Sequence, residues 1–292
     1  VYDDNIGSPR LSDSPGNANF GVRLFAPNID VNDMLGAGGL GTNADGSEFR
    51  TSDSTYSTNP YFAAYQFFNN STKARFIGSI DLRWDINEFL YAKGRFGSDR
   101  YDYDRTNGTP YGTAYSPLGA ISEYKLTREQ TDLDFLVGTN NLKIIDDLSV
   151  TAFLGVSQNG LKSESVTASG NQLIVPFLYN VKNTSNQSTG FSFSERKIHS
   201  AYGSAEIGFR NAAYLTVTAR NDWFSTLSLP NKKSPNNDLY TSASLSLVLS
   251  DLLKLPEAIS FAKFRAGYSQ VAGGAERPYQ LNLNYQIVDQ GH

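Results

Sequence analysis

The chain has 292 residues, a formal net charge of −4 and no cysteine. Without cysteine there are no disulfides and no thiolate metal sites, and a pI near 5.3 argues against a general nucleic-acid binder. The sequence contains no run of about 18 apolar residues, so it predicts no transmembrane helix. A membrane β-barrel stays open, because its alternating strands give only a weak hydropathy signal.

Residues 1–72 are rich in Gly, Ser, Asn and Asp and predict long loops with little regular structure. Within them, "GAGGLG" at 36–41 fits G-x-G-x-x-G, but "GTNADGSE" follows where a dinucleotide site requires a helix. The stretch "NADGSE" at 43–48 lacks the spacing of a calcium-binding EF-hand loop. We expect an outer loop that leads into the first strand.

The segment "ARFIGSIDLRWDI" at 74–86 is the first clear strand. Its even positions are all apolar and include Phe76 and Leu82, whereas its odd positions include Arg75 and Asp81. This alternation predicts a strand with one dry face and one charged face. At roughly 3.3 Å per residue, such a strand is longer than the hydrocarbon layer of a membrane is thick.

The same alternation recurs along the rest of the chain. Further strands are expected within 90–99, 131–138, 148–157, 200–210, 213–222, 239–250, 260–269 and 279–286. About nine such strands predict an all-β fold, specifically part of an antiparallel transmembrane β-barrel with long extracellular loops.

The connections between these strands alternate in length. The reversals at 85–89 and 210–213 are short, whereas 101–121 and 158–196 are long and polar. Outer-membrane barrels sort their turns in this way, and aromatic residues near strand ends, such as Trp84, fit an interfacial girdle. Aromatics also suit strands in general, so a soluble β-sandwich that binds carbohydrate remains an alternative.

No catalytic or metal-binding constellation is found in the sequence. His199 lacks a recognisable partner for general-base chemistry, and no G-x-S-x-G motif is present. The acidic groups fit solvated strand faces and strand ends: Asp132 and Asp134, and Asp99, Asp102 and Asp104. We therefore expect no enzyme activity, no metal and no cofactor.

Several motifs occur in a characteristic order. "NPYF" at 59–62 precedes the strand at 74–86, and "ARNDWFSTL" at 219–227 precedes the Ser-rich strand "SASLSLVLS" and "KFRAGY" at 263–268. This order resembles the SusC/RagA-type TonB-dependent transporters, although Phe224 departs from the family's usual Ser. The matching residues are Arg220, Asn221, Asp222, Trp223, Ser225, Thr226, Leu227, Lys263, Arg265, Ala266 and Tyr268.

The resemblance implies that 1–292 is part of one barrel domain, a presumed barrel of about 22 strands. In it, 1–72 would be mostly long loop and 73–292 consecutive strands and loops. The family's plug domain, TonB box and terminal strand are not in this sequence, and the ends at Val1 and "YQIVDQGH" suggest an interior piece of a longer protein.

The resemblance also implies partners and a location. Such transporters lie in the outer membrane of Gram-negative Bacteroidetes, in contact with its lipid and usually lidded by a SusD-like surface lipoprotein. They import oligosaccharides or peptides with energy transmitted by the TonB complex, and they bind no nucleic acid. A passive porin or adhesive barrel without TonB coupling is the alternative.

Substrate or lid contacts are expected in the outer loops at 59–70, 101–115 and 158–194. Aromatic side chains there can stack on sugars or peptides, and the alternative is that they only cover loop backbone. The candidates are Tyr61, Phe62, Tyr101, Tyr103, Tyr111 and Tyr115.

Overall fold

The computed structural model describes residues 2–5, 10, 14–23, 28–229, 235–253, 256, 259–275 and 277–281. The strands are β1 (Tyr2–Asn5), β2 (Phe68–Asp85), β3 (Leu90–Thr109), β4 (Ala120–Thr139), β5 (Leu142–Ile145), β6 (Leu148–Leu173), β7 (Thr184–Phe209), β8 (Ala213–Phe224), β9 (Asn237–Val248) and β10 (Lys263–Ser269). The helical segments are short: α1 (Ala18–Arg23), η1 (Val31–Leu35), α2 (Pro60–Tyr65), η2 (Val181–Asn183), η3 (Ser225–Leu227) and α3 (Leu249–Leu252).

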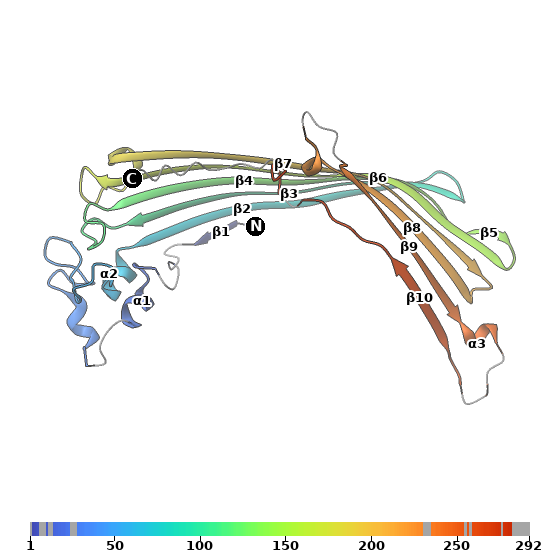
Figure 1. Ribbon diagram of the computed structural model, residues 1–292, viewed down its shortest axis with the longest axis horizontal. Coiled ribbons are helices and arrows are strands. Elements are labelled where there is room, and N and C mark those ends of the chain that lie inside the picture. Colours follow the sequence, from blue (N-terminus) through green and yellow to red (C-terminus); the bar gives the residue numbers. More distant parts are fainter. Residues whose placement is uncertain are drawn as a thin grey trace. The chain divides into compact units, whose positions relative to one another are not determined.

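The ten strands belong to one sheet, in the order β1-β2-β3-β4-β6-β7-β8-β9-β10, with β5 paired to β6. Apart from the short β5, strands that follow one another in the chain therefore lie side by side (Figure 1). The pairs β1–β2, β5–β6, β7–β8, β8–β9 and β9–β10 are antiparallel. The predicted all-β, antiparallel fold is confirmed.

The chain divides into two compact units, which are described separately. Unit 1 comprises 1–76, 100–128 and 163–193, and unit 2 comprises 77–99, 129–162 and 194–292. None of the helices in the described part of the chain combines the length and the apolar character of a membrane span.

The register of unit 2 explains why its sheet has two different faces. Val217 of β8 lies opposite Ala205 of β7 and Ala243 of β9, so apolar residues of the three strands share one face. The next residue, Thr218, lies opposite Ser204 and Ser242 and faces the other side. Side chains that alternate in sequence thus line up across the strands as apolar and polar rows.

The structure corrects the two loops that were expected to be longest. Of 101–121, only 110–119 connects strands, since β3 runs to Thr109 and β4 begins at Ala120. Of 158–196, only 174–183 connects β6 to β7. These strand extensions are mostly polar on both faces, so hydrophobic alternation is too weak there to reveal them. The backbone still pairs, because ladder hydrogen bonds need no apolar side chains.

The region before β2 contains more structure than the expected loop. Phe62, Ala63 and Phe67 form a small buried core, against which Ala18 and Tyr115 pack. Gly41 has a φ of 81°, and a Cβ atom there would lie 2.3 Å from the backbone nitrogen of Phe62. Glycine is required at this close approach.

The remaining sequence predictions have mixed outcomes. Residues 42–50, which follow "GAGGLG", form turns and isolated bridges and not a helix. Of the strand expected at 279–286, Tyr279–Leu281 form a turn and the rest lies outside the described residues. A sandwich would need a second sheet over the apolar face, and the described residues form a single sheet.

Candidate functional site

The polar face of the sheet in unit 2 carries charges that are matched with one another. The Asp81 carboxylate of β2 forms ion pairs with two residues of β3. Its Oδ1 lies 3.4 Å from Lys93 Nζ and 2.8 Å from Arg95 Nε. Asp132 of β4 accepts a hydrogen bond from Asn159 of β6 at 2.5 Å. The ion pairs of Asp81 are exposed and contribute little stability each, and with the half-buried Asp132 contact they make this face polar.

A second group of contacts on this polar face joins β4, β7 and β8. The Tyr202 hydroxyl donates to Asp134 at 2.5 Å, and the Arg220 guanidinium lies 5.6 Å from the Tyr202 ring. Arg220 also donates to Asp222 at 2.7 Å and to Ser200 at 2.9 Å.

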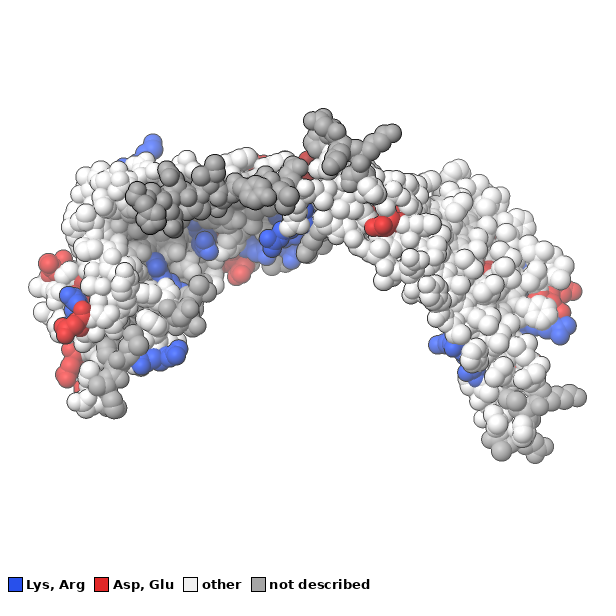
Figure 2. All heavy atoms as spheres, viewed as in Figure 1, with Lys and Arg blue, Asp and Glu red and all other residues white. Residues whose placement is uncertain are grey.

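The opposite, apolar face of unit 2 is exposed. Leu82 is 70% exposed and Leu154 75%, and Leu215 is exposed as well. Figure 2 shows a broad uncharged surface over β6 to β9, with charged atoms gathered mainly near the strand ends. Apolar side chains of this face therefore do not form a compact core among the described residues.

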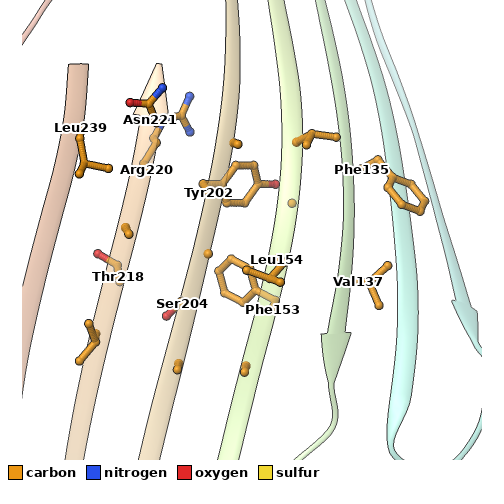
Figure 3. Close-up of a pocket in the computed structure, with 18 residues that line it drawn as sticks. Phe135, Val137, Phe153, Leu154, Tyr202, Ser204, Thr218, Arg220, Asn221 and Leu239 are labelled. Carbon is orange, nitrogen blue, oxygen red and sulfur yellow. The ribbon is translucent and has the colours of Figure 1, made fainter. Parts of the chain in front are cut away.

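A groove of about 990 Å³ runs over this apolar face. It forms because small residues of β7 and β8, such as Ala201, Gly203 and Ala219, lie between bulkier neighbours. Figure 3 shows Leu154 on one side of the groove and Leu239 on the other. Most of this lining is apolar, with the Asn221 amide at one end, so the groove suits hydrocarbon.

The run at 220–227 that resembles the SusC/RagA family has a structural role at the end of β8. After Phe224 the chain enters η3, where the Ser225 hydroxyl accepts a hydrogen bond from the backbone nitrogen of Lys197 at 2.8 Å. Thr226 is buried there. The run thus ends β8 and ties its turn to β7.

In unit 1, three connecting segments are joined by direct contacts. The Glu48 carboxylate accepts hydrogen bonds from the backbone nitrogens of Asn59 and Ala114, both at 2.8 Å. The backbone nitrogen of Tyr111 donates to the Tyr179 hydroxyl at 3.0 Å. The segments at 43–59, 110–119 and 174–183 therefore form one connected group.

Burial governs the ionisation of Glu48. Its side chain is almost fully buried, and this desolvation raises the pKa of the carboxyl group above its ordinary value. The hydrogen bonds from Ala114 and Asn59 act in the opposite direction, but they offset the effect only in part.

All six aromatic residues predicted as contact sites lie in unit 1. Tyr101 and Tyr103 share one face of β3; the Tyr103 ring meets Tyr124 edge-on at 6.3 Å. Tyr61 lies in α2, where it stacks on Tyr65 at 6.4 Å.

The other three candidates are held in the loops and the small core. The Tyr111 ring meets Phe177 edge-on at 5.4 Å, and Tyr115 stacks on Tyr56 at 6.0 Å. Phe62 is 0% exposed, so its ring is a core residue and is not presented to a ligand. A contact role for the other five residues stays a prediction.

A polar pocket of about 360 Å³ lies at the ends of four neighbouring strands in unit 1. Hydroxyl and amide side chains line it together with Arg10: Asn107, Thr109, Ser122, Ser169, Asn171, Asn186, Gln187 and Ser188. Ser122 and Ser169 hydroxyls are 2.9 Å apart, and Asn186 donates to Asn171 at 3.0 Å. The sequence did not indicate this polar pocket, because nearly all of its residues lie in segments that were expected to be loops.

The structure also places the acidic groups and His199. No three His, Asp or Glu side chains of the described residues lie close enough together to hold a metal ion. Asp102 accepts a hydrogen bond from Thr127 at 2.6 Å. His199 is exposed on β7, opposite Trp223.

Comparisons with known proteins identify a similar fold. No protein-family model matches the chain, and no curated protein sequence matches it significantly. A chain of the RagAB peptide transporter aligns with a TM-score of 0.62 at 17% identity, covering 73% of this chain and 24% of that chain. Chains of the RagAB peptide importer in its closed-closed and open-open states align with TM-scores of 0.60 and 0.61, both at 18% identity.

These alignments show the fold alone, because identity is low. Each covers 73% of this chain, and the two importer chains are covered to 24% and 23% of their length. The chain thus corresponds to about a quarter of the length of the transporter chains it matches. Within that part, its strands follow the fold of a peptide transporter chain.

Proposed function

We propose that this chain forms part of the barrel wall of a SusC/RagA-type TonB-dependent transporter, which imports a nutrient oligomer across the outer membrane of a Gram-negative bacterium. The observation that carries the proposal is the two-faced sheet of unit 2. Its exposed apolar face would be unfavourable against water over such an area, whereas in hydrocarbon it is stable. Its opposite face carries paired charges and hydroxyls that suit a wet passage.

Two further observations support the family. The motifs from Asn59 to Tyr268 occur in the family's order, and the fold resembles chains of a peptide transporter. The proposed substrate is an oligosaccharide or a peptide, and the RagAB structures favour a peptide. In this mechanism the substrate binds between wall, outer loops and lid, and force transmitted by TonB then displaces a plug. The chain makes and breaks no covalent bond.

The proposed partner at the outer end is a SusD-like surface lipoprotein. The turn between β6 and β7 presents exposed apolar side chains at its tip, namely Ile174, Val175, Phe177 and Leu178. An apolar patch on a loop tip is typical of a surface that another protein covers. Phe177 is held by Tyr111, so part of the patch is already positioned.

Uptake measurements test active import against a passive porin or adhesin. We expect deletion of the gene to abolish growth on, and uptake of, at least one class of oligopeptide or oligosaccharide. A protonophore should reduce uptake in the parent strain, because TonB draws energy from the inner membrane. Uptake that the protonophore does not affect would indicate a porin, and uptake of every oligomer unchanged by the deletion would contradict a nutrient role.

A further inference from the structure

Three cations in unit 1 contact aromatic rings in place of carboxylates. Lys73 Nζ lies 4.5 Å from the centre of the Tyr101 ring, and Arg105 Cζ lies 5.6 Å from that of Tyr124. Arg10 Cζ lies 4.6 Å from the centre of the Phe67 ring. We call these three cations and their rings the basic–aromatic cluster. Among the described residues, none of the three cations forms an ion pair with an acidic side chain.

The cluster faces the polar side of its strands. Tyr101, Tyr103 and Arg105 alternate along β3, and the next members of the same row are Asn107 and Thr109. The Arg10 guanidinium donates to the side chains of both, at 2.9 and 3.1 Å. The cluster and the polar pocket therefore form one continuous surface.

The charge balance of this surface differs from that of unit 2. There, Lys93, Arg95 and Arg220 all contact carboxylates within 4.0 Å. In unit 1, side chains alternate between the two faces along β2, β3 and β4. The residues of these strands that belong to unit 1 place cations on the polar face, and no carboxylate. Cations therefore outnumber carboxylates on this surface.

Two carboxylates lie close to the cluster. Asp99 precedes Tyr101 in the same row of β3. Asp3 of β1 is the register partner of Lys73, but the two side chains form no ion pair, and the Lys73 ammonium lies over Tyr101 instead. These two carboxylates, Asp3 and Asp99, offset only part of the charge of Arg10, Lys73 and Arg105.

Arg10 marks the most specific point of the surface. Its guanidinium is half-buried, and burial lowers its pKa, because a charged group is costly to remove from water. Among the described residues, its guanidinium donates to neutral groups of Asn107, Gly108 and Thr109, and its Nε is buried without a hydrogen-bond partner. A buried cation is ordinarily matched by an anion.

We propose that this surface binds the carboxylates of an acidic oligomer, with Arg10, Lys73 and Arg105 as the cationic contacts. Tyr101, Tyr103 and Tyr124 offer ring faces to the oligomer, and the hydroxyls and amides of the polar pocket hydrogen-bond its neutral parts. The inference rests on the proposed function, and it narrows the substrate to carboxylate-bearing peptides or carboxylate-bearing sugars.

Binding to the protein purified from its own membrane in detergent tests the proposal. The probes are hexaglutamate with hexaglutamine as its neutral match, and a galacturonic-acid hexamer with its neutral methyl ester. We expect one acidic probe to bind at least about tenfold more tightly than its neutral match at low salt, and less tightly as salt is raised. Which of the two acidic probes binds distinguishes a peptide source of the carboxylate from a sugar source.

Charge-removing variants locate the site. The double variant Lys73→Gln with Arg105→Gln should weaken binding of the acidic probe about tenfold. The matched control is Arg100→Gln with Lys125→Gln, which removes two charges from the opposite face of β3 and β4 and should leave binding unchanged. Arg10→Gln should also weaken binding, but it removes hydrogen bonds that position the N-terminal segment, so the first pair is decisive.

Three outcomes would overturn the inference: equal binding of acidic and neutral probes, no binding of either acidic probe, or equal losses in the two double variants. The proposed function is judged separately in cells. If neutral oligomers are imported and acidic ones are not preferred, import stands and the carboxylate site fails. If deletion of the gene changes no uptake, the import function fails whatever the purified protein binds.

Discussion

Asn59 is fully buried and uses all of its side-chain polar groups. Its Nδ2 donates to the carbonyl oxygens of Met34 and Phe49 at 2.8 and 2.9 Å. Its Oδ1 accepts from the backbone nitrogens of Tyr61 and Phe62, which caps α2. One side chain therefore joins η1, the segment at Phe49 and the helix whose Phe62 forms the small core.

We expect Asn59→Ala to destabilise this part of unit 1 by about 2 kcal/mol or more, because it leaves two carbonyls and a helix N-terminus unsatisfied. Hydrogen exchange at residues 31–67 measures the effect. Asn32→Ala is the control, since Asn32 is exposed and its side chain bonds only to Asp30 among the described residues. Equal protection in the two variants would contradict the role of Asn59.

The raised pKa of Glu48 predicts that the stability of the folded protein depends on pH. Because its pKa is raised in the folded protein, the folded state binds a proton more readily than the unfolded state. The resulting stabilisation is fully present below the ordinary glutamate pKa and is lost as pH rises through the raised value. In Glu48→Gln this pH dependence is absent, and an amide faces the Ala114 nitrogen.

Hydrogen exchange at 110–119, corrected for intrinsic rates, should therefore show less protection in Glu48→Gln than in the wild type. The gap between the two proteins should widen as pH falls. A gap that stays constant, or one that widens as pH rises, would show that Glu48 is not held as the structure has it. Asp45→Asn is a suitable control, since Asp45 is exposed and bonds only to Ser47 among the described residues.

At the scale of elements, each long strand presents two chemically different faces. In β8, odd residues such as Val217 lie on the apolar face, and even residues such as Thr218 lie on the polar one. A shift of register by one residue would turn every polar side chain of β8 towards the apolar side. The alternation therefore determines both the pairing and the orientation of the sheet.

The pair Val217→Arg and Thr218→Arg tests this orientation in neighbouring residues. Arginine on a lipid-facing position costs about 2–4 kcal/mol near mid-depth, whereas a position on the wet face tolerates it. We expect Val217→Arg to lower the folded yield in the outer membrane and the urea midpoint in lipid vesicles, with little change in Thr218→Arg. Equal losses in both variants would mean that neither face meets lipid.

The tip between β6 and β7 makes a separate prediction about the lid. Ile174→Ser with Leu178→Ser removes exposed apolar surface without touching Phe177, which packs on Tyr111. We expect co-purification of the surface lipoprotein to fall several-fold while the protein still folds. The control Ile145→Ser changes an exposed apolar residue of β5 and should leave co-purification unchanged. Co-purification that is unchanged in the double variant would exclude this tip as the contact.

For the whole molecule, the uncovered apolar face of unit 2 predicts where the protein resides. We expect it to sediment with the outer-membrane fraction and to leave that fraction only with detergent, since the apolar face needs hydrocarbon or a substitute. Recovery of the folded protein from the aqueous fraction without detergent would contradict both barrel functions. High-salt washing is the control, because salt releases proteins that are held only by surface charge.

The sequence allowed good prediction where one face of a strand is apolar. The segments at 74–86 and 213–222 alternate clearly. The first lies in β2 except for its last residue, and the second lies within β8. Prediction failed for the outer ends of β3, β6 and β7, where Ser, Asn, Asp and Tyr occupy both faces. Period-two hydrophobicity is absent there, although the backbone still pairs.

For the candidate site, the sequence could indicate Tyr101 and Tyr103 as aromatic residues near a strand end, but not their neighbours. Tyr124 meets Tyr103 and Arg105 only because β3 and β4 are paired. Arg10 lies 97 residues from Asn107 in the chain, and no local pattern links the two. Phe62 also looked like an exposed loop aromatic, and only packing showed it to be buried.

By itself, the sequence determined that this protein is a series of antiparallel strands with a dry side and a wet side, because alternation is a local property that each strand carries alone. The tertiary structure decided how far the strands extend, that Asn59 and Glu48 tie separate loops together, and that Arg10, Lys73 and Arg105 contact rings in place of carboxylates. Those features depend on contacts between residues distant in the chain, which only the pairing of strands and the packing of loops can create.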